Sequence, residues 1–240
     1  MLKRIIWPLY FVAALFVAYL IYKQLPEYLQ KGGPLVALLI FLSILVVTFI
    51  IERTISLRKA QGRGSLPGFL TSVKKNLAAG NVEAAIADCK KQGGSAASVM
   101  RSGLERFLQA RADGLPREKV ITETQGAIQE ANALEVPLLE RNLIALSTIA
   151  SIATMVGLLG TTIGMIRSFA ALGTSGAVDA TRLAIGISEA LVNTAGGLSV
   201  AITGIVAYNV FVTKVDSFNY MMDEASYEAV QLLTSRSTED

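Results

Sequence analysis

The chain has 240 residues, of which 52% are hydrophobic and only 17% are charged, and its formal net charge is +3. A soluble domain rarely has so apolar a composition, so the first interpretation is a membrane protein. Because the chain has one cysteine and no histidine, an internal disulfide is excluded, and neither a metal site nor a cofactor is expected.

Four segments hold the roughly 20 mostly apolar residues that a membrane-spanning helix needs, and they lie at residues 5–22, 34–51, 142–172 and 183–212. Lys3 and Arg4 precede the first segment, which is also typical of a signal peptide. This segment lacks a clear small-x-small cleavage site, however, and a second apolar segment follows it closely. We therefore expect an uncleaved first helix, with a cleaved signal peptide as the alternative.

Basic residues gather after the second apolar segment. Glu52 is the only acidic residue between 52 and 75, whereas the basic ones are Arg53, Arg58, Lys59, Arg63, Lys74 and Lys75. Positive charge marks the cytoplasmic side of a membrane protein. We therefore expect both termini and residues 52–141 to be cytoplasmic, with the two short loops facing outward. The basic run is expected to contact anionic lipid rather than nucleic acid.

Residues 52–141 have a helical pattern with clear start and stop signals. Ser65 and Pro67 begin one helix, which ends at Gly80. Asn81 caps the next helix, which ends at Gly93-Gly94. This second helix carries Cys89, which we interpret as a small buried apolar residue.

Two further helices are predicted before the third membrane segment. Ser95 caps one that runs to about Ala112, and Pro116 begins another, which continues into the membrane with a kink at Pro137. The apolar face expected for this last helix comprises Val120, Ala127, Ile128, Ala131, Leu134 and Leu138.

The tail from Lys214 is predicted to be a cytoplasmic helix, with one face formed by Val215, Phe218, Met222 and Ala225. The expected fold is therefore all-α: a polytopic helical membrane protein whose long membrane helices are extended by a cytoplasmic helical bundle. The expected domains are two N-terminal membrane helices, a cytoplasmic helical region, a pore-forming helix pair and a C-terminal helix, at residues 1–51, 52–141, 142–212 and 213–240.

Small residues recur at three- and four-residue spacing in the third and fourth segments. This spacing lets membrane helices approach closely. We expect helix–helix contacts, within or between subunits, at Gly160, Gly164, Gly197 and Gly204.

Polar residues inside the same two segments suggest an ion pathway. Thr154 and Thr161 are two turns apart, while Glu189, Asn193 and Thr194 cluster within one and a half turns. Thr161 and Thr194 each lie about 11 residues from the outer end of their segment, about 16 Å deep. Two hydroxyl groups at one depth predict a polar ring if the protein is a cyclic oligomer. The alternative is that each hydroxyl bonds its own helix backbone.

The two charges of these segments fall at matching depths. Arg167 and Glu189 both lie about 8–9 Å below the outer surface by helix rise. One interpretation is an ion pair, within a subunit or across a ring. The alternative is that the arginine reaches outward to the headgroups and the carboxyl group takes a proton.

An enzyme is not expected, because no Ser-His-Asp set, Cys-His pair, phosphate-binding loop or paired carboxylates are present. The stretches LSTIASIATMVGLLGTTIGMIRSF and GISEALVNTAGGLSVAITGIVAYNVF instead resemble the ExbB/TolQ/MotA group of motor proteins. The resemblance covers about residues 145–211 and is closest to ExbB and TolQ, through VGL-x-GT-x-x-G, GI-x-EAL-x-x-TA-x-GL and YN.

The resemblance implies a proton-channel and stator subunit of an ion-driven motor in the bacterial inner membrane. The implied assembly is a homopentamer whose pore holds two single-helix partners of the ExbD/TolR type; a TonB-like protein is a further partner that it suggests. By motif position, Thr161, Glu189 and Thr194 correspond to polar pore residues of the family. We expect the partner's helix to supply an Asp, since no carboxylate lies at the depth of the two threonines.

The chain departs from the ExbB/TolQ pattern in two respects. Thr154 and Thr203 stand where ExbB and TolQ commonly have proline, and the first apolar segment is extra, as in the four-helix MotA. Two alternatives therefore stay open: a stator subunit of the flagellar or gliding type, and a membrane scaffold that conducts no ions.

Overall fold

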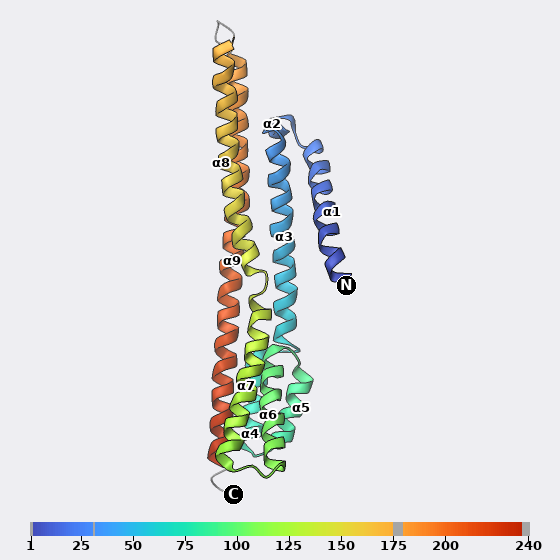
Figure 1. Ribbon diagram of the computed structural model, residues 1–240, viewed down its shortest axis with the longest axis vertical. Helices are drawn as coiled ribbons and strands as arrows, with labels where there is room; N and C mark the ends of the chain where they lie inside the picture. Colours follow the sequence, from blue (N-terminus) through green and yellow to red (C-terminus); the bar gives the residue numbers. More distant parts are fainter. Residues whose placement is uncertain (1, 31, 175–179, 237–240) are drawn as a thin grey trace. The chain divides into compact units, whose positions relative to one another are not determined.

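The computed structural model describes residues 2–30, 32–174 and 180–236. Every regular element in these ranges is an α-helix (Figure 1), and the elements are α1 (Leu2–Gln24), α2 (Glu27–Gln30), α3 (Pro34–Gln61), α4 (Leu66–Ala78), α5 (Val82–Gln92), α6 (Ser95–Ala112), α7 (Arg117–Glu140), α8 (Leu143–Thr174) and α9 (Ala180–Arg236). They form two compact units. Unit 1 comprises Met1–Glu52 with Asn142–Val210, and unit 2 comprises Arg53–Arg141 with Phe211–Asp240.

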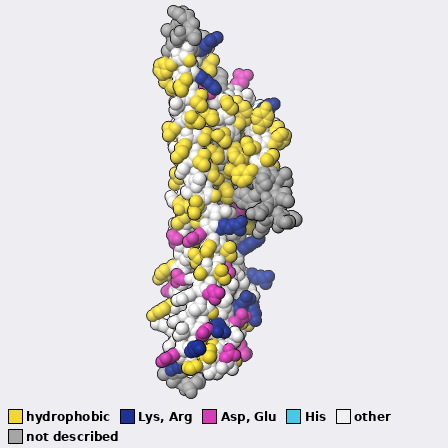
Figure 2. Space-filling view, in the orientation of Figure 1, with side chains coloured by type: hydrophobic (Ala, Val, Ile, Leu, Met, Phe, Trp, Pro, Cys, Tyr) yellow, Lys and Arg dark blue, Asp and Glu magenta, His cyan; other side chains and the backbone are white. Residues whose placement is uncertain are grey.

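Unit 1 is built from long apolar helices. Within the described residues, the three helical stretches long and apolar enough to cross a membrane are Pro34–Ala78, Arg117–Ala170 and Ala180–Ser235. Figure 1 shows α8 side by side with the first part of α9, and hydrophobic side chains cover most of the visible face of this unit (Figure 2). Large apolar residues that would be buried in a soluble protein are exposed here, as Leu158, Ile166, Leu191 and Ile202 illustrate. This pattern is that of a helical membrane protein.

The first predicted membrane segment forms α1. Its side chains are described from Phe11 onward, and the apolar stretch Phe11–Gln24 is shorter than a full span. The ring of Phe11 lies 6.0 Å from that of Phe41, so α1 packs against α3. A complete crossing of the membrane by α1 stays a prediction.

The helix signals of unit 2 are confirmed with one change. Ser65 precedes α4, whose first turn contains Pro67, and the Asn81 side chain accepts a 2.9 Å hydrogen bond from the amide of Ala84 at the start of α5. The change concerns α6: Gly94, with φ of 84°, occupies the cap position, and Ser95 is the first helical residue. A glycine can take this left-handed conformation without the steric cost of a side chain.

The helix predicted from Pro116 does not continue unbroken into the third membrane segment. Pro137 lies inside α7, and the chain breaks instead between α7 and α8, at Arg141 and Asn142. Asn142 has φ of 63°, a left-handed value that asparagine tolerates better than most residues. The buried Arg53 donates a 3.1 Å hydrogen bond to the Leu139 carbonyl, which the end of α7 leaves without a helical partner.

The predicted apolar face of α7 is correct at Val120 and Ile128 but wrong at Leu134 and Leu138, which are 69% and 55% exposed. Leu139 is buried instead. At about 100° per residue, Leu139 returns to the face of Ile128 after three turns, whereas the two exposed leucines point elsewhere.

The tail from Lys214 is helical, as predicted, and forms the last part of α9, which continues without a break from Ala180 to Arg236. Its expected face is largely correct: Val215, Phe218 and Met222 are buried and Ala225 is half-buried.

Cys89 provides a test of the packing of unit 2. Its side chain is 2% exposed, and burial, with a smaller contribution from Asp88, raises the pKa of the thiol to about 12. At pH 8 a thiol reagent should therefore label the native protein on the order of 1,000-fold more slowly than the denatured chain, whose thiol has a pKa of about 8.5. The same shift stabilises the fold below about pH 8.5, and this contribution falls as the pH rises toward 12.

The control for this labelling is Cys89→Ser, which removes the only thiol of the chain. Rapid labelling of the native protein would mean that α5 does not pack as described.

Candidate functional site

The contact between α8 and α9 is formed by residues with little or no side chain. A Cβ atom added to Gly197 would lie 2.6 Å from the Ala153 carbonyl oxygen and 2.8 Å from the Cα of Gly157. A Cβ atom on Gly164 would lie 2.7 Å from the carbonyl oxygen of Gly186. These distances are too short for any side chain larger than hydrogen, so the two backbones are in direct contact.

The other two predicted glycines also face the opposite helix. Gly160 lies against the side chain of Asn193, and Gly204 lies against Ala150. Residues further along α8 contact residues earlier in α9, as the pairs Gly157–Gly197 and Gly164–Gly186 show. The two helices therefore pack as an antiparallel hairpin. This register determines which polar residues meet.

Asn193 is a buried polar residue of this contact. Its side chain is fully buried, and its amide nitrogen donates hydrogen bonds to the carbonyls of Gly32 (2.8 Å) and Glu189 (3.0 Å). Its Oδ1 atom has no hydrogen-bond partner within the described residues. The bond to Gly32 joins α9 to the turn that precedes α3.

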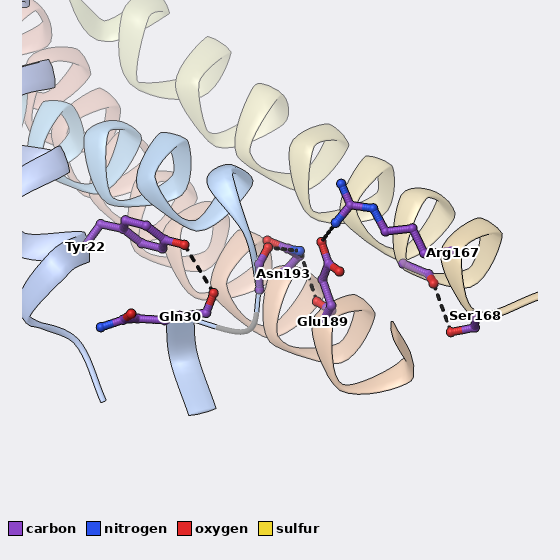
Figure 3. A network of polar contacts seen from close by, with 8 residues as sticks. Tyr22, Gln30, Arg167, Ser168, Glu189 and Asn193 are labelled. Carbon is purple, nitrogen blue, oxygen red and sulfur yellow. Dashed lines mark hydrogen bonds and ion pairs between the residues drawn. The ribbon is translucent and has the colours of Figure 1, made fainter. Parts of the chain in front are cut away.

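Arg167 and Glu189 are in direct contact (Figure 3). The Nη1 atom of Arg167 lies 2.5 Å from Oε1 of Glu189, and the side chains are 56% and 9% exposed, respectively. Gly33, with φ of 71°, packs on the same carboxylate, since a Cβ atom there would lie 2.8 Å from Oε1. The ion pair is therefore enclosed on the carboxylate side and open on the guanidinium side.

The threonines lie at the edge of the α8–α9 contact. Thr154, Thr161 and Thr194 are half-buried. Thr161 donates to the Leu158 carbonyl at 2.6 Å, and Thr154 to that of Ala150 at 3.2 Å. Thr194 donates to Ala190 at 3.2 Å and across to Gly157 of α8 at 3.4 Å.

These contacts modify the expected polar ring. Thr194 is level with Gly157, so it lies about one helical turn from Thr161 along the hairpin rather than at the same depth. The hydroxyl groups bond backbone carbonyls, as the alternative interpretation of the sequence expected.

Three residues of this region were not recognised in the sequence. Ser168 is fully buried and donates to the carbonyls of Gly164 (3.0 Å) and Leu183 (3.3 Å). Gly32 and Gly33 form the turn that covers Asn193 and Glu189. The Gly-Gly-Pro sequence marks a turn but carries no sign of its distant contacts. Within the described residues, no group of three or more Cys, Asp or Glu side chains is arranged to hold a metal ion.

Comparison with known proteins gives consistent matches. The model of the MotA/TolQ/ExbB proton channel family matches residues 96–224. An ExbB-like biopolymer transport protein of Synechocystis is 33% identical over 195 residues, which cover 80% of this chain and 71% of that protein.

Two shorter matches have higher identity. A second ExbB-like protein of Synechocystis is 44% identical over 92 residues, covering 38% of this chain and 44% of the relative. TolQ of the Tol-Pal system of Pseudomonas aeruginosa is 36% identical over 114 residues, covering 47% of this chain and 49% of the relative. The chain thus aligns with less than half of these two relatives.

The backbone contact predicts a specific sensitivity to added side chains. Gly197→Ala should lower the free energy of unfolding by about 1–3 kcal/mol, because the new methyl group would meet the α8 backbone. The measurement is denaturant unfolding of the purified protein in detergent. Gly126→Ala in α7 is the control: a Cβ atom there meets nothing within 4 Å, so this change should stabilise by about 0.5–1 kcal/mol. Equal stability of Gly197→Ala and the parent protein would contradict the contact.

The ion pair predicts an asymmetry between its two partners. Arg167→Met should cost more than Glu189→Gln, because it leaves a carboxylate that is only 9% exposed without its counter-charge. We expect a cost on the order of 1–3 kcal/mol, between the values for exposed and buried pairs. The double variant should recover part of this loss. The measurement is unfolding of the two single variants and the double variant; additive losses would show that the two residues act independently.

Proposed function

Because the chain belongs to the MotA/TolQ/ExbB proton channel family, we propose that it is the proton-channel and stator subunit of an ion-driven motor in the bacterial inner membrane. The subunits form a ring, which we propose to be a pentamer, and α8 and α9 line its central pore. Unit 2 and both termini lie in the cytoplasm, as the basic residues after residue 52 favour.

The observation that carries this proposal is the direction of Thr194. Gly196 faces α3, since a Cβ atom there would lie 3.1 Å from Leu39. Thr194 comes two residues earlier, about 200° around α9, and therefore points away from α3. Leu191 and Leu198, which are 63% and 47% exposed, follow on the same side. This face, half polar and directed away from α3, suits a pore with a partner inside it.

Thr161 belongs to the same side of the helix hairpin. The guanidinium of Arg167 contacts the Glu189 carboxylate, which Gly33 covers. Thr161 lies six residues before Arg167 on α8, so its side chain points about 120° away from that contact. Thr154 lies two turns further along the same side of α8. The three hydroxyl groups thus form a row facing the proposed pore.

The proton carrier at mid-membrane must come from a partner. Glu189 is the only carboxylate in residues 143–174 and 180–210, and it is joined to Arg167. We propose a single-helix partner of the ExbD/TolR type, present as a dimer in the pore, with an Asp near the start of its helix. A threonine hydroxyl can donate to a carboxylate or accept from a carboxylic acid. The row of hydroxyl groups can therefore hydrogen-bond the Asp in both its deprotonated and its protonated form.

The names of the relatives favour a motor that serves transport or maintenance of the cell envelope over one that rotates a flagellum. They are a biopolymer transport group and a Tol-Pal protein, so the motor proposed here energises transport or maintenance of the outer envelope. The extra apolar helix α1 favours a second candidate, a stator of the flagellar or gliding type.

The test replaces the two hydroxyl groups nearest mid-membrane. The double variant Thr161→Val/Thr194→Val keeps the side-chain shape but removes the partners of the proton carrier. It should reduce proton-driven activity by about 100-fold or more, within the range attributed to positioned proton-transfer groups, while leaving the oligomer intact. The measurements are proton flux in reconstituted vesicles with the co-purified partner and the mass of the complex.

The matched control is Thr48→Val/Thr203→Val. Both hydroxyl groups bond a carbonyl of their own helix, at 2.8 and 2.9 Å, as that of Thr161 does. Thr203 lies nine residues from Thr194, about half a turn around α9, and so faces away from the proposed pore. Full proton flux in the Thr161/Thr194 variant, or equal loss in the control, would contradict the proposal.

A further inference from the structure

Asn193 is connected to the N-terminal helix α1 through a chain of hydrogen bonds within unit 1 (Figure 3). Its amide nitrogen donates to the Gly32 carbonyl of the turn before α3 at 2.8 Å. The carbonyl of Gln30, just before this turn, accepts from the Tyr22 hydroxyl of α1 at 3.2 Å and from the Gly33 amide at 3.0 Å. The proton path proposed above uses neither Tyr22 nor Gln30, so these contacts require their own explanation.

The Gln30 side chain fastens the same turn to the end of α1. Its Nε2 atom donates to the Leu25 carbonyl at 2.6 Å and to the Lys23 carbonyl at 3.3 Å. Both carbonyls lie at the C-terminal end of α1, where a helix leaves its carbonyls without helical partners. The turn is therefore held by α1 on one side and bonded by Asn193 of α9 on the other.

The turn fits closely against α9. Gly32 is buried, and a Cβ atom there would lie 2.9 Å from the side chain of Val192. A Cβ atom at Gly33 would lie 2.8 Å from Oε1 of Glu189. Glu189, Val192 and Asn193 follow the i, i+3, i+4 spacing of one helix face. A turn of two glycines is thus fitted to this face of α9, and a side chain at either position would separate them.

Asn193 combines complete burial with an unsatisfied atom. Its side chain is fully buried, and its Oδ1 atom has no hydrogen-bond partner within the described residues. A buried polar atom without a partner lowers stability. A buried asparagine in a coiled coil likewise lowers stability, but it fixes the register of the helices. Here the amide nitrogen can do the same, by fixing the height and rotation of α9 against the turn.

We infer that α1 fixes the position of α9 through the Gly32–Gly33 turn and thereby orients Thr194 toward the pore. The positioning residues are Tyr22, Gln30 and Asn193. The inference rests on the proposed function, in which Thr194 is a hydrogen-bond partner of the proton carrier. Adjacent residues of a helix differ by about 100° in direction, so a contact that holds Asn193 sets the direction of Thr194 without entering the pore. The extra helix α1 acts as the anchor of this contact.

The experiment measures a distance inside the subunit together with proton flux. In the Cys89→Ser background, Val47→Cys on α3 and Ile185→Cys on α9 carry spin labels at exposed positions. Ile185 lies nine residues before Thr194, about half a turn around α9, and so outside the pore-facing row. Electron–electron resonance on the full-length complex, diluted with unlabelled subunits, reports the position of α9 relative to α3. Reconstituted vesicles of the unlabelled variants, with the co-purified partner, report proton flux.

Two variants remove the positioning contacts from opposite ends. Asn193→Leu keeps the branching of the side chain but removes its donor, and Tyr22→Phe/Gln30→Met loosens the turn without altering α8 or α9. Each should broaden or shift the distance distribution. Each should also lower proton flux by about tenfold or more, since a small misplacement of a reacting group can cost about 100-fold. If Asn193→Leu does not fold, the second variant provides the test.

The matched control is Tyr19→Phe/Gln24→Met, the same two changes elsewhere in α1. Neither side chain makes a hydrogen bond within the described part of the chain. A phenylalanine ring also keeps the contact with Lys23, whose Nζ atom lies 5.0 Å from the centroid of Tyr19. The control should therefore match the parent protein in distance and flux.

The distance readout separates this inference from the proposed function. A role limited to stability would lower the unfolding midpoint but leave the distance within the folded protein unchanged. Unchanged distances in the test variants, or equal changes in the control, would therefore overturn the inference. Altered distances with full proton flux would support the positioning contact and contradict the pore role of Thr194.

Discussion

The direct backbone contact between α8 and α9 is the constraint on which the rest of unit 1 depends. In a membrane no hydrophobic effect drives two helices together, so their association relies on close packing and hydrogen bonds. Glycines at positions 157, 164 and 197 allow that packing. The resulting register brings Asn193 beneath Gly160 and Arg167 to Glu189. It also turns the large residues outward, where lipid or other subunits can cover them.

The sequence predicted much of this arrangement because a helix hairpin is a local structure. The two helices follow one another closely in the sequence, so counting residues from their facing ends is enough to place Arg167 and Glu189 at one level. The same counting misplaced Thr194 by about one turn, since the ends of the helices are less certain than their periodicity. Small residues at regular spacing indicated the contact face, as the buried positions of α9 now illustrate.

Features that depend on distant contacts were not predictable. Gly32 meets Asn193 across 161 residues of sequence, and nothing local in a Gly-Gly-Pro turn indicates such a partner. The break at Asn142 was missed because the helical pattern runs on through it, and Arg53, which bonds the Leu139 carbonyl near the end of α7, lies 86 residues earlier in the sequence. Likewise, the exposed Leu134 and Leu138 were assigned to the core because periodicity alone does not say which apolar face is covered.

The position of the ion pair also bears on the proposed ion path. Glu189 is enclosed by Arg167 and the Gly33 turn, whereas Thr194 lies five residues later, about 140° around α9. A carboxylate that must gain and lose a proton needs access to water and a partner for each state. Glu189 already has a partner in Arg167, and the Gly33 turn covers its Oε1 atom. This geometry favours a structural role for Glu189, joining α8 and α9 to the turn before α3. The proton carrier proposed above is accordingly a carboxylate that enters the threonine-lined face from outside the chain.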